Sequence, residues 1–568
     1  MRTTDKRHVR DLARICAAKG LRHVVLSPGS RCAPLVIAFH RQDGIDCLSI
    51  NDERSAAFYA LGMAQQLREP VGLVCTSGSA ILNYAPALAE AFYQGVPLMV
   101  FTADRPNEWI DQGENQSIRQ DDIYRNYIKR SFSLPVSFEG EKDAWYSARM
   151  VSEALNESVR AVPGPVHVNV PLREPLYDLA EDDGAWPKTI DVVPTEAVIP
   201  DRVMNRLLRS WHDAARIWVI AGWHDPDPDL EASLQALTRD PRVVLWTEAT
   251  ANLHVPNQID RMDPVIEWIA ARSDEDRWLP DLVVTFGGGI VSKKLKFLLR
   301  NRFDGQHWHL SPDARHWDKF QSLSQVVPTD PARLFYNLLE DKEVHSSDYQ
   351  KNVIGIQAGI DRMSATRIAD LDHQDHTVFA QVLHALPPEA VLQAGNSTPI
   401  RYVNLFSLSH RPDVTVHANR GVSGIDGQVS TAAGAAHVTD RPVLSVTGDI
   451  GFLYDSNALW NTHLSPNLRI VVIDNGGGNI FRIIPGPDRL DELESSFETP
   501  QNVDLEQLVT AFGHAVRSAD DPASTAEGLD WLMAPSETVR VLVVTTPGEV
   551  SAAGLRDYFR LIRELDIR

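Results

Sequence analysis

Short apolar runs recur along the chain, each ending in Gly, Ser or Asp and each followed by a segment of helical length. The runs at 23–27 (HVVLS), 216–221 (RIWVIA) and 539–546 (VRVLVVTT) are apolar at nearly every position. Such runs are typical of parallel strands that helices cover on both faces. Further runs of this kind begin at Val71, Pro97, Val166, Arg242, Asp281, His307, Ala390, Val414, Pro442 and Leu468. The pattern predicts an α/β protein with parallel sheets flanked by helices.

Two polar stretches divide these runs into three groups. Residues 181–201 (EDDGAWPKTIDVVPTEAVIPD) are acidic and proline-punctuated, and residues 341–352 (DKEVHSSDYQKN) are polar throughout. Both compositions are typical of linkers. A chain of 568 residues is also too long for one hydrophobic core. We therefore predict three domains, at 1–180, 195–340 and 353–568.

Two segments of the first and last groups are alike. Residues 70–106 and 441–477 each contain a strand, a Thr or Ser next to Gly, a helix, and a second strand that runs into Asp. The simplest interpretation is one β-α-β unit used twice. The alternative is that any two such units look alike.

Charge and cysteine content limit the functional classes. Lys and Arg number 55 against 76 Asp and Glu, a formal net charge of −21, so the whole molecule has no electrostatic footprint for nucleic acid or an anionic membrane. Local basic pockets stay possible. No run reaches the ~18–20 apolar residues that span a bilayer, and the first 20 residues predict a polar amphipathic helix rather than a secretory signal. Four cysteines without C-x-x-C spacing predict a reduced, cytoplasmic protein: Cys16, Cys32, Cys47 and Cys75.

Oxygen-bearing residues follow two neighbouring apolar runs of the last group. PVLSV leads into Thr447, Gly448 and Asp449, and IVVID leads into Asn475 and the glycines 476–478. Adjacent parallel strands would bring both ends to one edge of the sheet, where ligands of α/β sheets bind. A carboxylate, an amide oxygen and a glycine carbonyl suit Mg²⁺, and glycines let a diphosphate approach the backbone. The alternative is a structural turn with an Asp cap and a glycine-rich loop.

This pair resembles the metal and diphosphate motif of the thiamine diphosphate-dependent enzymes, G-D-G followed by N-N, although this chain reads G-D-I and D-N. The resemblance implies a pyrimidine-binding first domain, a central domain and a diphosphate-binding last domain. It also implies that Asp449, Asn475 and the Gly477 carbonyl bind Mg²⁺ or Mn²⁺.

Glu53 follows the strand CLSI and stands where that family has a glutamate against the cofactor's aminopyrimidine ring. A carboxyl group that shares a proton with a ring nitrogen promotes formation of the reactive thiazolium ylide. The alternative is an ordinary glutamate in the first turn of a helix, favoured by the helix dipole.

Several segments, in order, are similar to one branch of the family, the menaquinone-pathway synthases that join 2-oxoglutarate to isochorismate. These segments are SPGSRCAP, TSGSA, TADRP, GENQSI, GGGIVSKKL, GNST, ANRGVSGIDG and GDIGFLYD. The resemblance implies decarboxylation of 2-oxoglutarate and a conjugate, Stetter-like addition to isochorismate. It further implies a homodimer or homotetramer, with the cofactor between the first domain of one subunit and the last domain of another.

Four arginines in turns directly after strands suit this task, because each substrate has two carboxylates and Arg binds carboxylates in bidentate fashion: Arg31, Arg105, Arg401 and Arg420. A single Arg in a turn is more often a solvated surface group. By resemblance, Ser30, Arg31, Gln116, Arg401 and Arg420 join Glu53 in the catalytic set. The implied substrate pocket consists of Ser30, Arg31, Arg105, Asn115, Gln116, Lys293, Ser397, Arg401, Arg420, Ile480 and Phe481. Lys294 is the alternative to Lys293.

The implied cofactor site places Ile425 as the apolar wedge that bends the cofactor, with Ile480 and Phe481 as walls near the thiazolium. Plain core packing is the alternative for these three residues. The full implied cofactor set is Glu53, Thr76, Gly78, Ser397, Ser423, Gly424, Ile425, Gly448, Asp449, Ile450, Asn475, Gly477, Gly478 and Ile480.

Two other functions are alternatives to this interpretation. Another thiamine diphosphate enzyme, such as an acetolactate synthase or a 2-oxoacid decarboxylase, handles small monoanionic acids and does not need the SPGSR segment or the additional arginines. A nucleotide-binding regulatory relic would lack the metal pair and Glu53 together. The glycines 287–289 lack the full G-x-G-x-x-G spacing of a dinucleotide site. His307, His309 and His316 are interpreted as structural rather than metal-binding.

Overall fold

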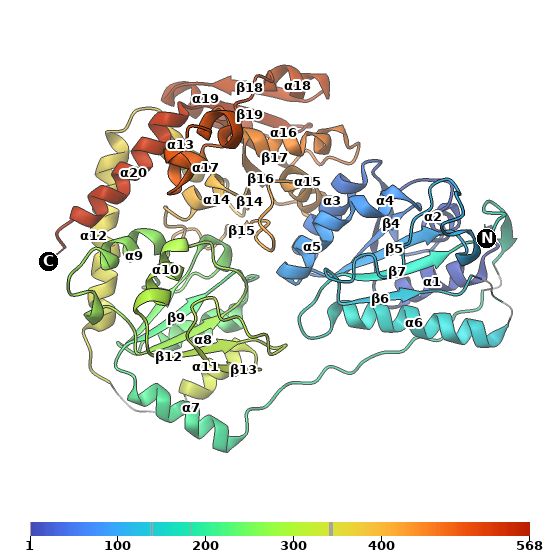
Figure 1. Ribbon diagram of the computed structural model, residues 1–568, viewed down its shortest axis with the longest axis horizontal. Helices are drawn as coiled ribbons and strands as arrows, with labels where there is room; N and C mark the ends of the chain where they lie inside the picture. Colours follow the sequence, from blue (N-terminus) through green and yellow to red (C-terminus); the bar gives the residue numbers. More distant parts are fainter. Residues whose placement is uncertain (1, 137, 139, 183, 340–344, 568) are drawn as a thin grey trace.

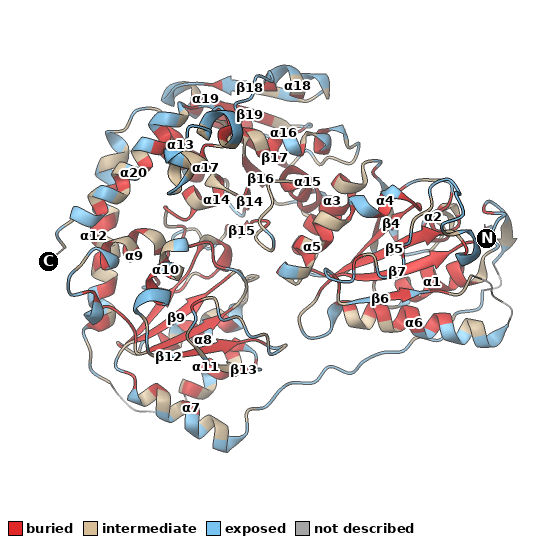
Figure 2. Ribbon diagram, in the orientation of Figure 1, coloured by how far each residue is buried: buried red, intermediate tan, exposed pale blue. Residues whose placement is uncertain are grey.

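The computed structural model describes residues 2–136, 138, 140–182, 184–339 and 345–567. These residues form three parallel sheets and one short antiparallel pair. Figure 1 shows three α/β bodies, in chain order at the right, the lower left and the top of the view. Figure 2 shows that the buried residues follow the strands of all three sheets. The predicted α/β class, with parallel sheets flanked by helices, is confirmed.

The first sheet has the order β3-β2-β4-β5-β7-β6. Its strands are β2 (His23–Ser27), β3 (Asp46–Ser49), β4 (Val71–Cys75), β5 (Leu98–Asp104), β6 (Arg130–Ser133) and β7 (Val166–Pro171). Its helices are α1 (Arg7–Ala18), α2 (Ala33–His40), α3 (Glu53–Leu67), α4 (Ser79–Asn83), α5 (Ala85–Gln94), η1 (Asn107–Trp109) and α6 (Glu141–Val159). The first helix begins later than predicted because β1 (Arg2–Thr4) pairs with β8 (Leu179–Glu181).

The central sheet has the order β10-β9-β11-β12-β13. Its strands are β9 (Ile217–Ala221), β10 (Val243–Trp246), β11 (Leu282–Phe286), β12 (Gln306–Leu310) and β13 (Leu323–Val327). The accompanying helices are α7 (Asp201–Asp213), α8 (Pro228–Leu237), η2 (Ala249–Ala251), α9 (Met262–Ala270), η3 (Glu275–Arg277), α10 (Lys293–Arg302) and α11 (Pro331–Leu339). Thr285 lies between His307 and His309 and bonds to both rings, at 3.0 and 2.9 Å.

The last sheet has the order β15-β14-β16-β17-β19-β18. Its strands are β14 (Val391–Ala394), β15 (Thr415–His417), β16 (Val443–Gly448), β17 (Leu468–Asp474), β18 (Ala515–Ala519) and β19 (Arg540–Thr545). Its helices are α12 (Tyr349–Ala369), α13 (Asp375–His384), α14 (Thr398–Val403), α15 (Gln428–His437), α16 (Asp449–Tyr454), η4 (Ser456–Trp460), α17 (Ile480–Ile483), η5 (Pro487–Arg489), η6 (Leu493–Glu498), α18 (Leu505–Ala511), α19 (Pro522–Met533) and α20 (Gly548–Glu564).

The first and last sheets have the same topology. Counted along its own segment, each sheet has the strand order second, first, third, fourth, sixth, fifth. The segments that read alike in the sequence, 70–106 and 441–477, contain the third and fourth strands of their sheets. They therefore occupy the same place in two copies of one arrangement, as the interpretation of a repeated unit predicts.

The helices α3 and α15 join the first body to the last. A Cβ on Gly62 of α3 would lie 1.8 Å from the carbonyl oxygen of Thr431 on α15. Conversely, a Cβ on Gly434 of α15 would lie 1.9 Å from the carbonyl oxygen of Tyr59. The two backbones are thus in direct contact, which only glycine at both positions permits.

The connections between the bodies differ from each other. Between β8 and α7 the described residues form neither helix nor strand, and Figure 2 shows them exposed. Residues 340–344 of the second predicted linker lie outside the described residues, and α12 begins at Tyr349, inside the predicted linker. The domain limits 1–180, 195–340 and 353–568 stay predictions. Across the residues that the structure describes, none of the helices is long and apolar enough to cross a bilayer.

The α3–α15 contact gives a first prediction. The substitution Gly62→Ala should lower the free energy of unfolding by about 1–3 kcal/mol or more, because the added methyl group forces two backbones apart. Gly355→Ala in α12 is the matched control, since nothing lies within 4 Å of the Cβ it would carry. That control should stabilise the chain by roughly 0.5–1 kcal/mol through helix propensity alone. Urea unfolding of both variants measures the free energies of unfolding. Equal changes in the two variants would contradict the backbone contact between α3 and α15.

Candidate active site

The two oxygen-bearing strand ends of the last sheet lie side by side. β16 and β17 are hydrogen-bonded parallel neighbours, with Gly448 opposite Ile473. Asp449 is the first residue of α16, and Asn475 directly follows β17. The structure therefore brings the predicted metal-binding residues to one carboxyl edge, where α/β sheets bind their ligands.

The Asp449 carboxylate is buried and only partly satisfied. Its side chain is 2% exposed, and Oδ1 accepts a hydrogen bond from the backbone N–H of Ile450 at 2.8 Å. Oδ2 is buried and has no hydrogen-bond partner among the described residues. Burial, with a smaller contribution from the nearby carboxylates of Asp474 and Asp375, raises the pKa of Asp449 to about 7 against the lowering effect of the Ile450 and Gly477 N–H groups. A buried, unpaired oxygen among three carboxylates fits a divalent cation.

Asp375, which sequence reasoning missed, orients Asn475. Its side chain is fully buried, and its Oδ2 accepts a hydrogen bond from Asn475 Nδ2 at 2.9 Å. Its Oδ1 accepts from Thr546 Oγ1 at 2.6 Å and from Ser551 Oγ at 3.1 Å. Because the amide nitrogen of Asn475 is held in this way, its amide oxygen is left for a metal ion. The only signal in the sequence was an Asp at the start of a helix, which usually indicates a cap.

The glycine that supplies the third predicted ligand has a backbone that other residues do not readily adopt. Gly477 has φ +137°, and a Cβ there would lie 2.6 Å from the carbonyl oxygen of Glu498. The next N–H, of Gly478, donates to the same oxygen at 2.7 Å. No group of three or more His, Cys, Asp or Glu in the described part of the chain is arranged to hold a metal. A metal at this edge would therefore use the mixed set of carboxylate, amide and carbonyl oxygens.

A cavity of about 850 Å³ lies between the central body and the last body. Lys293, Lys294, Arg401 and Ile480 are among the residues that line it. Arg401 Nε is buried without a hydrogen-bond partner in the described residues. No ion pair of Arg401 is recorded there either. A half-buried guanidinium without a recorded ion pair is suited to binding an anion.

Arg420 lies near Arg401. Its Nη1 donates to the side-chain oxygen of Asn396 at 3.2 Å. Burial lowers the pKa of Arg420, and the charge of Arg401 lowers it further, whereas the carboxylates of Glu248 and Glu90 raise it. Two partly buried like charges so close together favour the binding of an anion between them.

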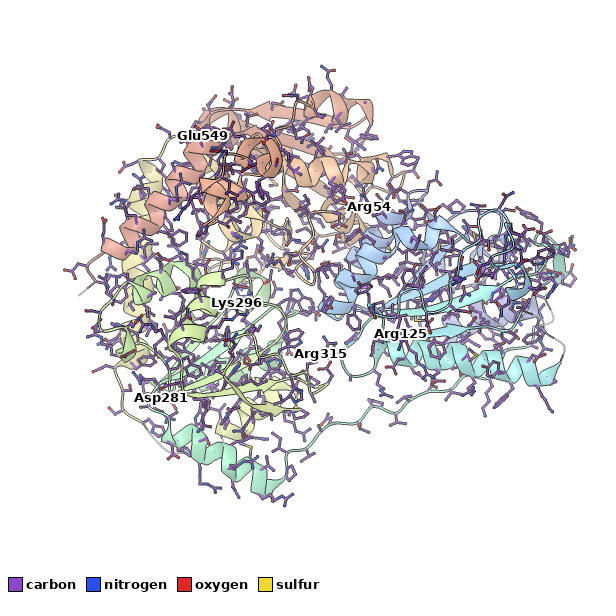
Figure 3. All side chains as sticks on the ribbon, viewed as in Figure 1. Arg54, Arg125, Asp281, Lys296, Arg315 and Glu549 are labelled. Carbon is purple, nitrogen blue, oxygen red and sulfur yellow. The ribbon has the colours of Figure 1, made fainter. Side chains whose placement is uncertain are left out.

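The central body contributes four lysines, of which sequence reasoning singled out Lys293 and Lys294 but not Lys296 or Lys319. Lys293 is exposed in the first turn of α10, and Lys294 is hydrogen-bonded to Glu267. Lys296, in the following turn, is half-buried. Figure 3 shows it in the part of the central body nearest to the last body. Burial lowers the pKa of Lys296, and the charges of Arg420 and Arg401 lower it further. Burial and Lys296 lower the pKa of Lys319 to about 8.

Glu248, a fully enclosed carboxylate, fixes the start of the lysine helix. It accepts hydrogen bonds from the backbone N–H groups of Val291 at 2.7 Å and Ser292 at 2.6 Å. Ser292 in turn caps α10 by accepting from the N–H of Leu295 at 3.0 Å. The backbone that presents Lys293 is therefore held by a buried anion.

The predicted residues of the first body also gather at one sheet edge, after β2, β4 and β5. A Cβ on Gly29 would lie 2.5 Å from the Cβ of Thr76, and one on Gly78 would lie 3.1 Å from the Cα of Gln116. Arg105 donates to the Asn115 carbonyl oxygen through Nε at 3.0 Å and Nη2 at 2.7 Å. The structure thus brings together Ser30, Arg31, Thr76, Gly78, Arg105, Asn115 and Gln116, which we call the first-body cluster.

The arginines of the first-body cluster differ from those of the last body in having carboxylate partners. Arg31 pairs with Glu174 at 3.1 Å, and Arg105 pairs with Glu114 at 3.2 Å. The Ser30 hydroxyl bonds to the exposed hydroxyl of Tyr177 at 2.9 Å. Ser30, Asn115 and Gln116 are themselves exposed. Three residues of the first-body cluster therefore face solvent in a single chain, whereas Arg31, Thr76 and Gly78 are buried.

Glu53 is the first residue of α3 and is half-buried. The preceding Asp52 caps the helix by accepting from the N–H groups of Arg54 at 2.9 Å and Ser55 at 3.1 Å. Within the described ranges no hydrogen bond or ion pair of the Glu53 carboxylate is recorded. Figure 3 shows the neighbouring Arg54 where α3 meets the last body, and its guanidinium donates to the Tyr454 carbonyl oxygen at 2.7 Å.

The remaining predicted residues lie in turns of the last body. Ser397 and Ser423 have φ values of +73° and +66°, in the left-handed region that is uncommon for serine. Half-buried positions are occupied by Gly424, Ile425, Gly448, Ile450, Gly478, Ile480 and Phe481. Across the described chain, no recorded hydrogen bond or ion pair links the first-body cluster to Arg401, Arg420 or Asp449. We call these two sets of predicted residues the first-body and last-body half-sites. The start of α3 does contact the last body, since Asp52 accepts a hydrogen bond from Asn457 Nδ2 at 2.7 Å.

Two family matches define the class of protein. Residues 7–123 match the family described as Thiamine pyrophosphate enzyme, N-terminal TPP binding domain, and residues 398–544 match Thiamine pyrophosphate enzyme, C-terminal TPP binding domain. The first match includes Glu53, and the second includes Asp449 and Asn475. The chain is a thiamine diphosphate enzyme, which confirms the predicted cofactor and, with it, the divalent metal ion that such enzymes use.

The curated relatives specify the branch. The relatives are named 2-succinyl-5-enolpyruvyl-6-hydroxy-3-cyclohexene-1-carboxylate synthase. The one in Porphyromonas gingivalis is 38% identical to this chain, over 98% of this chain and 98% of the relative. The relative in Flavobacterium johnsoniae is 38% identical over 96% and 97%, and the one in Bacteroides fragilis is 32% identical over 99% and 100%. This chain belongs to the 2-succinyl-5-enolpyruvyl-6-hydroxy-3-cyclohexene-1-carboxylate synthase family.

We call the edge of the last sheet that carries Asp449, Asn475 and Gly477 the metal edge. It gives a second prediction. Gly477→Ala should weaken binding of Mn²⁺, used as a probe in electron paramagnetic resonance, by about tenfold or more, because the new methyl group would displace the backbone from Glu498. Gly476→Ala is the control: its φ is +84°, but nothing lies within 4 Å of its Cβ. Both variants therefore place an alanine at a positive φ, and only Gly477→Ala also brings its methyl group against another residue. Equal losses of Mn²⁺ affinity would contradict a ligand role for this turn.

Proposed function

We propose that this chain catalyses the thiamine diphosphate-dependent decarboxylation of 2-oxoglutarate and the conjugate, Stetter-like addition of the succinyl unit to isochorismate. The products would be CO₂ and 2-succinyl-5-enolpyruvyl-6-hydroxy-3-cyclohexene-1-carboxylate, for menaquinone biosynthesis. The observation that carries the proposal is the pair of arginines without carboxylate partners, Arg401 and Arg420, beside the metal edge, in a chain of this family. Small monoanionic acids, the substrates of an acetolactate synthase or a 2-oxoacid decarboxylase, do not require that much positive charge.

In this proposal the last body holds the cofactor. Asp449, Asn475 and the Gly477 carbonyl bind Mg²⁺ or Mn²⁺, and the glycine turns admit the diphosphate. Bound thiamine diphosphate supplies the electron sink and carbon nucleophile that amino acid side chains lack. Glu53 holds a proton at the aminopyrimidine nitrogen, and Ile425 and Ile480 exclude water around the reacting carbon. These roles are supported by the positions of the residues at two sheet edges.

The substrates are recognised by their carboxylates. Arg401 and Arg420 attract dianions into the 850 Å³ cavity, and Lys293 lines the same cavity. Lys296 adds a further positive charge next to both arginines. Arg105 holds the Asn115 carbonyl, which supports a role in shaping the loop that presents Asn115 and Gln116.

We further infer a homo-oligomer, a dimer or a tetramer, in which the first-body cluster of one chain completes the last-body half-site of another. The exposure of Ser30, Asn115 and Gln116 supports this arrangement. A reduced, cytoplasmic setting is supported by four free cysteines, three of them buried.

The direct test is CO₂ release from 2-oxoglutarate with and without isochorismate. We expect rapid release only with both substrates, together with stoichiometric loss of isochorismate absorbance. Asp449→Ala is the inactive control. Rapid turnover of pyruvate without isochorismate would instead favour an acetolactate synthase or a decarboxylase.

Glu53→Gln should leave binding of thiamine diphosphate and Mg²⁺ nearly unchanged but abolish most exchange of the cofactor's C2 proton with deuterium, which NMR measures. The amide cannot share a proton with the ring nitrogen as the carboxyl group does. Glu141→Gln, at the first residue of α6, controls for the loss of a helix-terminal charge. Normal exchange in Glu53→Gln would refute the assigned role.

The shared site gives a subunit-mixing prediction. Inactive Glu53→Gln and inactive Asp449→Ala chains should regain activity when they are unfolded and refolded together. A mixed dimer would then have one site with both substitutions and one intact site, so random mixing should restore about one quarter of wild-type activity. Each variant refolded alone is the control. No recovery, despite mixed dimers seen by native mass spectrometry, would place both residues of a site in one chain.

A further inference from the structure

We propose that Glu90, a buried residue of the first body, is a positioning residue for the loop 418–425 of the last body in the same chain. This loop contains Arg420, Ser423 and Ile425. The inference rests on the proposed function only for the roles of those three residues. The loop contacts themselves are independent of it.

The Glu90 carboxylate lies within a row of backbone N–H groups. Glu90 is on α5 and 1% exposed. Its Oε1 accepts from the N–H of Gly421 at 2.5 Å, and its Oε2 accepts from the N–H of Val422 at 2.8 Å. Successive N–H groups of this kind form a concave site for an anion. The loop thus binds a carboxylate that another body of the protein supplies.

Neighbouring glutamines extend this contact. Gln94, one turn after Glu90 on α5, donates from Nε2 to Glu90 and also to the Ala418 carbonyl oxygen, at 3.3 Å for the latter. Gln65 of α3 donates to Gln94 Oε1 at 2.6 Å. Among the described residues no ion pair of Glu90 is recorded, and burial raises its pKa. The charge is therefore balanced by N–H dipoles of the loop and by amides, with Arg420 as a nearby positive charge rather than an ion-pair partner.

The loop is fixed from the opposite side as well. Asn396, after β14, donates from Nδ2 to the carbonyl oxygen of Gly424 at 2.6 Å and also to that of Asn419. The Oδ1 of the same side chain accepts from Arg420 at 3.2 Å. A Cβ on Gly421 would lie 2.6 Å from the Glu90 carbonyl oxygen. Glu90 and Asn396 thus hold the loop backbone from both sides. This placement determines the position of the Arg420 guanidinium.

The consequence is that one first body serves two sites. In the proposed oligomer its Glu53 and first-body cluster complete the site of the partner chain. Its Glu90, on another helix, sets the loop of its own chain's site. Substitution of Glu90 should therefore act on substrate and cofactor handling without removing any group that touches them.

The test uses Glu90→Gln in the full-length chain. In glutamine one carboxylate oxygen becomes an NH₂ group, which would face the N–H of Gly421 or Val422 as donor against donor, so the loop should loosen. We expect faster hydrogen–deuterium exchange in peptides covering 415–427, and an increase of about tenfold or more in the KM for the substrate that Arg420 binds. The exchange readout does not require that the enzyme is active, so a failure of the proposed function would leave it intact.

Asp281→Asn is the matched control. Asp281 also accepts from two successive N–H groups, of Ala215 at 3.1 Å and Arg216 at 2.9 Å. Figure 3 shows it at the outer edge of the central body, far from loop 418–425. This control should leave exchange at 415–427 and both KM values unchanged.

Unchanged exchange at 415–427 in Glu90→Gln, or a KM within twofold of the wild type, would overturn the proposal. If Glu90→Gln does not fold, Gln94→Met removes the bonds to Glu90 and Ala418 while it keeps the carboxylate. It should increase exchange of the same peptides to a smaller extent. An exchange pattern equal to that of the wild type in Gln94→Met would then overturn the proposal.

Discussion

The arrangement of this protein depends on the backbone contact between α3 and α15. Gly62 and Gly434 let the two helices touch without intervening side chains, so the first body has one fixed position on the last. Because α3 begins at Glu53 and packs against α5, that position also determines where Glu53 points and whether Glu90 reaches loop 418–425. A shift of one helix past the other would disturb both half-sites at once.

The cavity between the central and last bodies differs in charge from the molecule as a whole. The net charge of −21 is consistent with an acidic exterior, whereas the cavity between the central and last bodies borders Arg401, Lys293 and Lys294. Next to these cations, three carboxylates gather at the metal edge, Asp449, Asp474 and Asp375. In the proposed function, anionic substrates and a divalent cation would therefore have separate, adjacent sites. A diphosphate would link the two kinds of charge, since it binds a metal through its oxygens and is itself an anion.

Sequence alone predicted the buried strands, because they are apolar on both faces, and the motif residues, because their spacing matches a family. It missed β6, β13 and β18, which are edge strands with exposed, polar positions such as Arg130 and Arg517. Asp375, Glu90, Glu248 and Lys296 were missed for another reason. Each acts through residues far away in the chain, as Glu90 does on Gly421, and no local pattern reveals such a contact.

The repeated topology gives the chain two carboxyl sheet edges with different residues. Hydroxyls, amides and paired arginines lie at the edge of the first copy, and carboxylate and amide oxygens with unpaired arginines lie at the edge of the last. The crossing at Gly62 and Gly434 fixes the position of one copy on the other. In the proposed homodimer a second chain with the same crossing supplies the first-body cluster to each last-body half-site, and the twofold symmetry completes both sites at once.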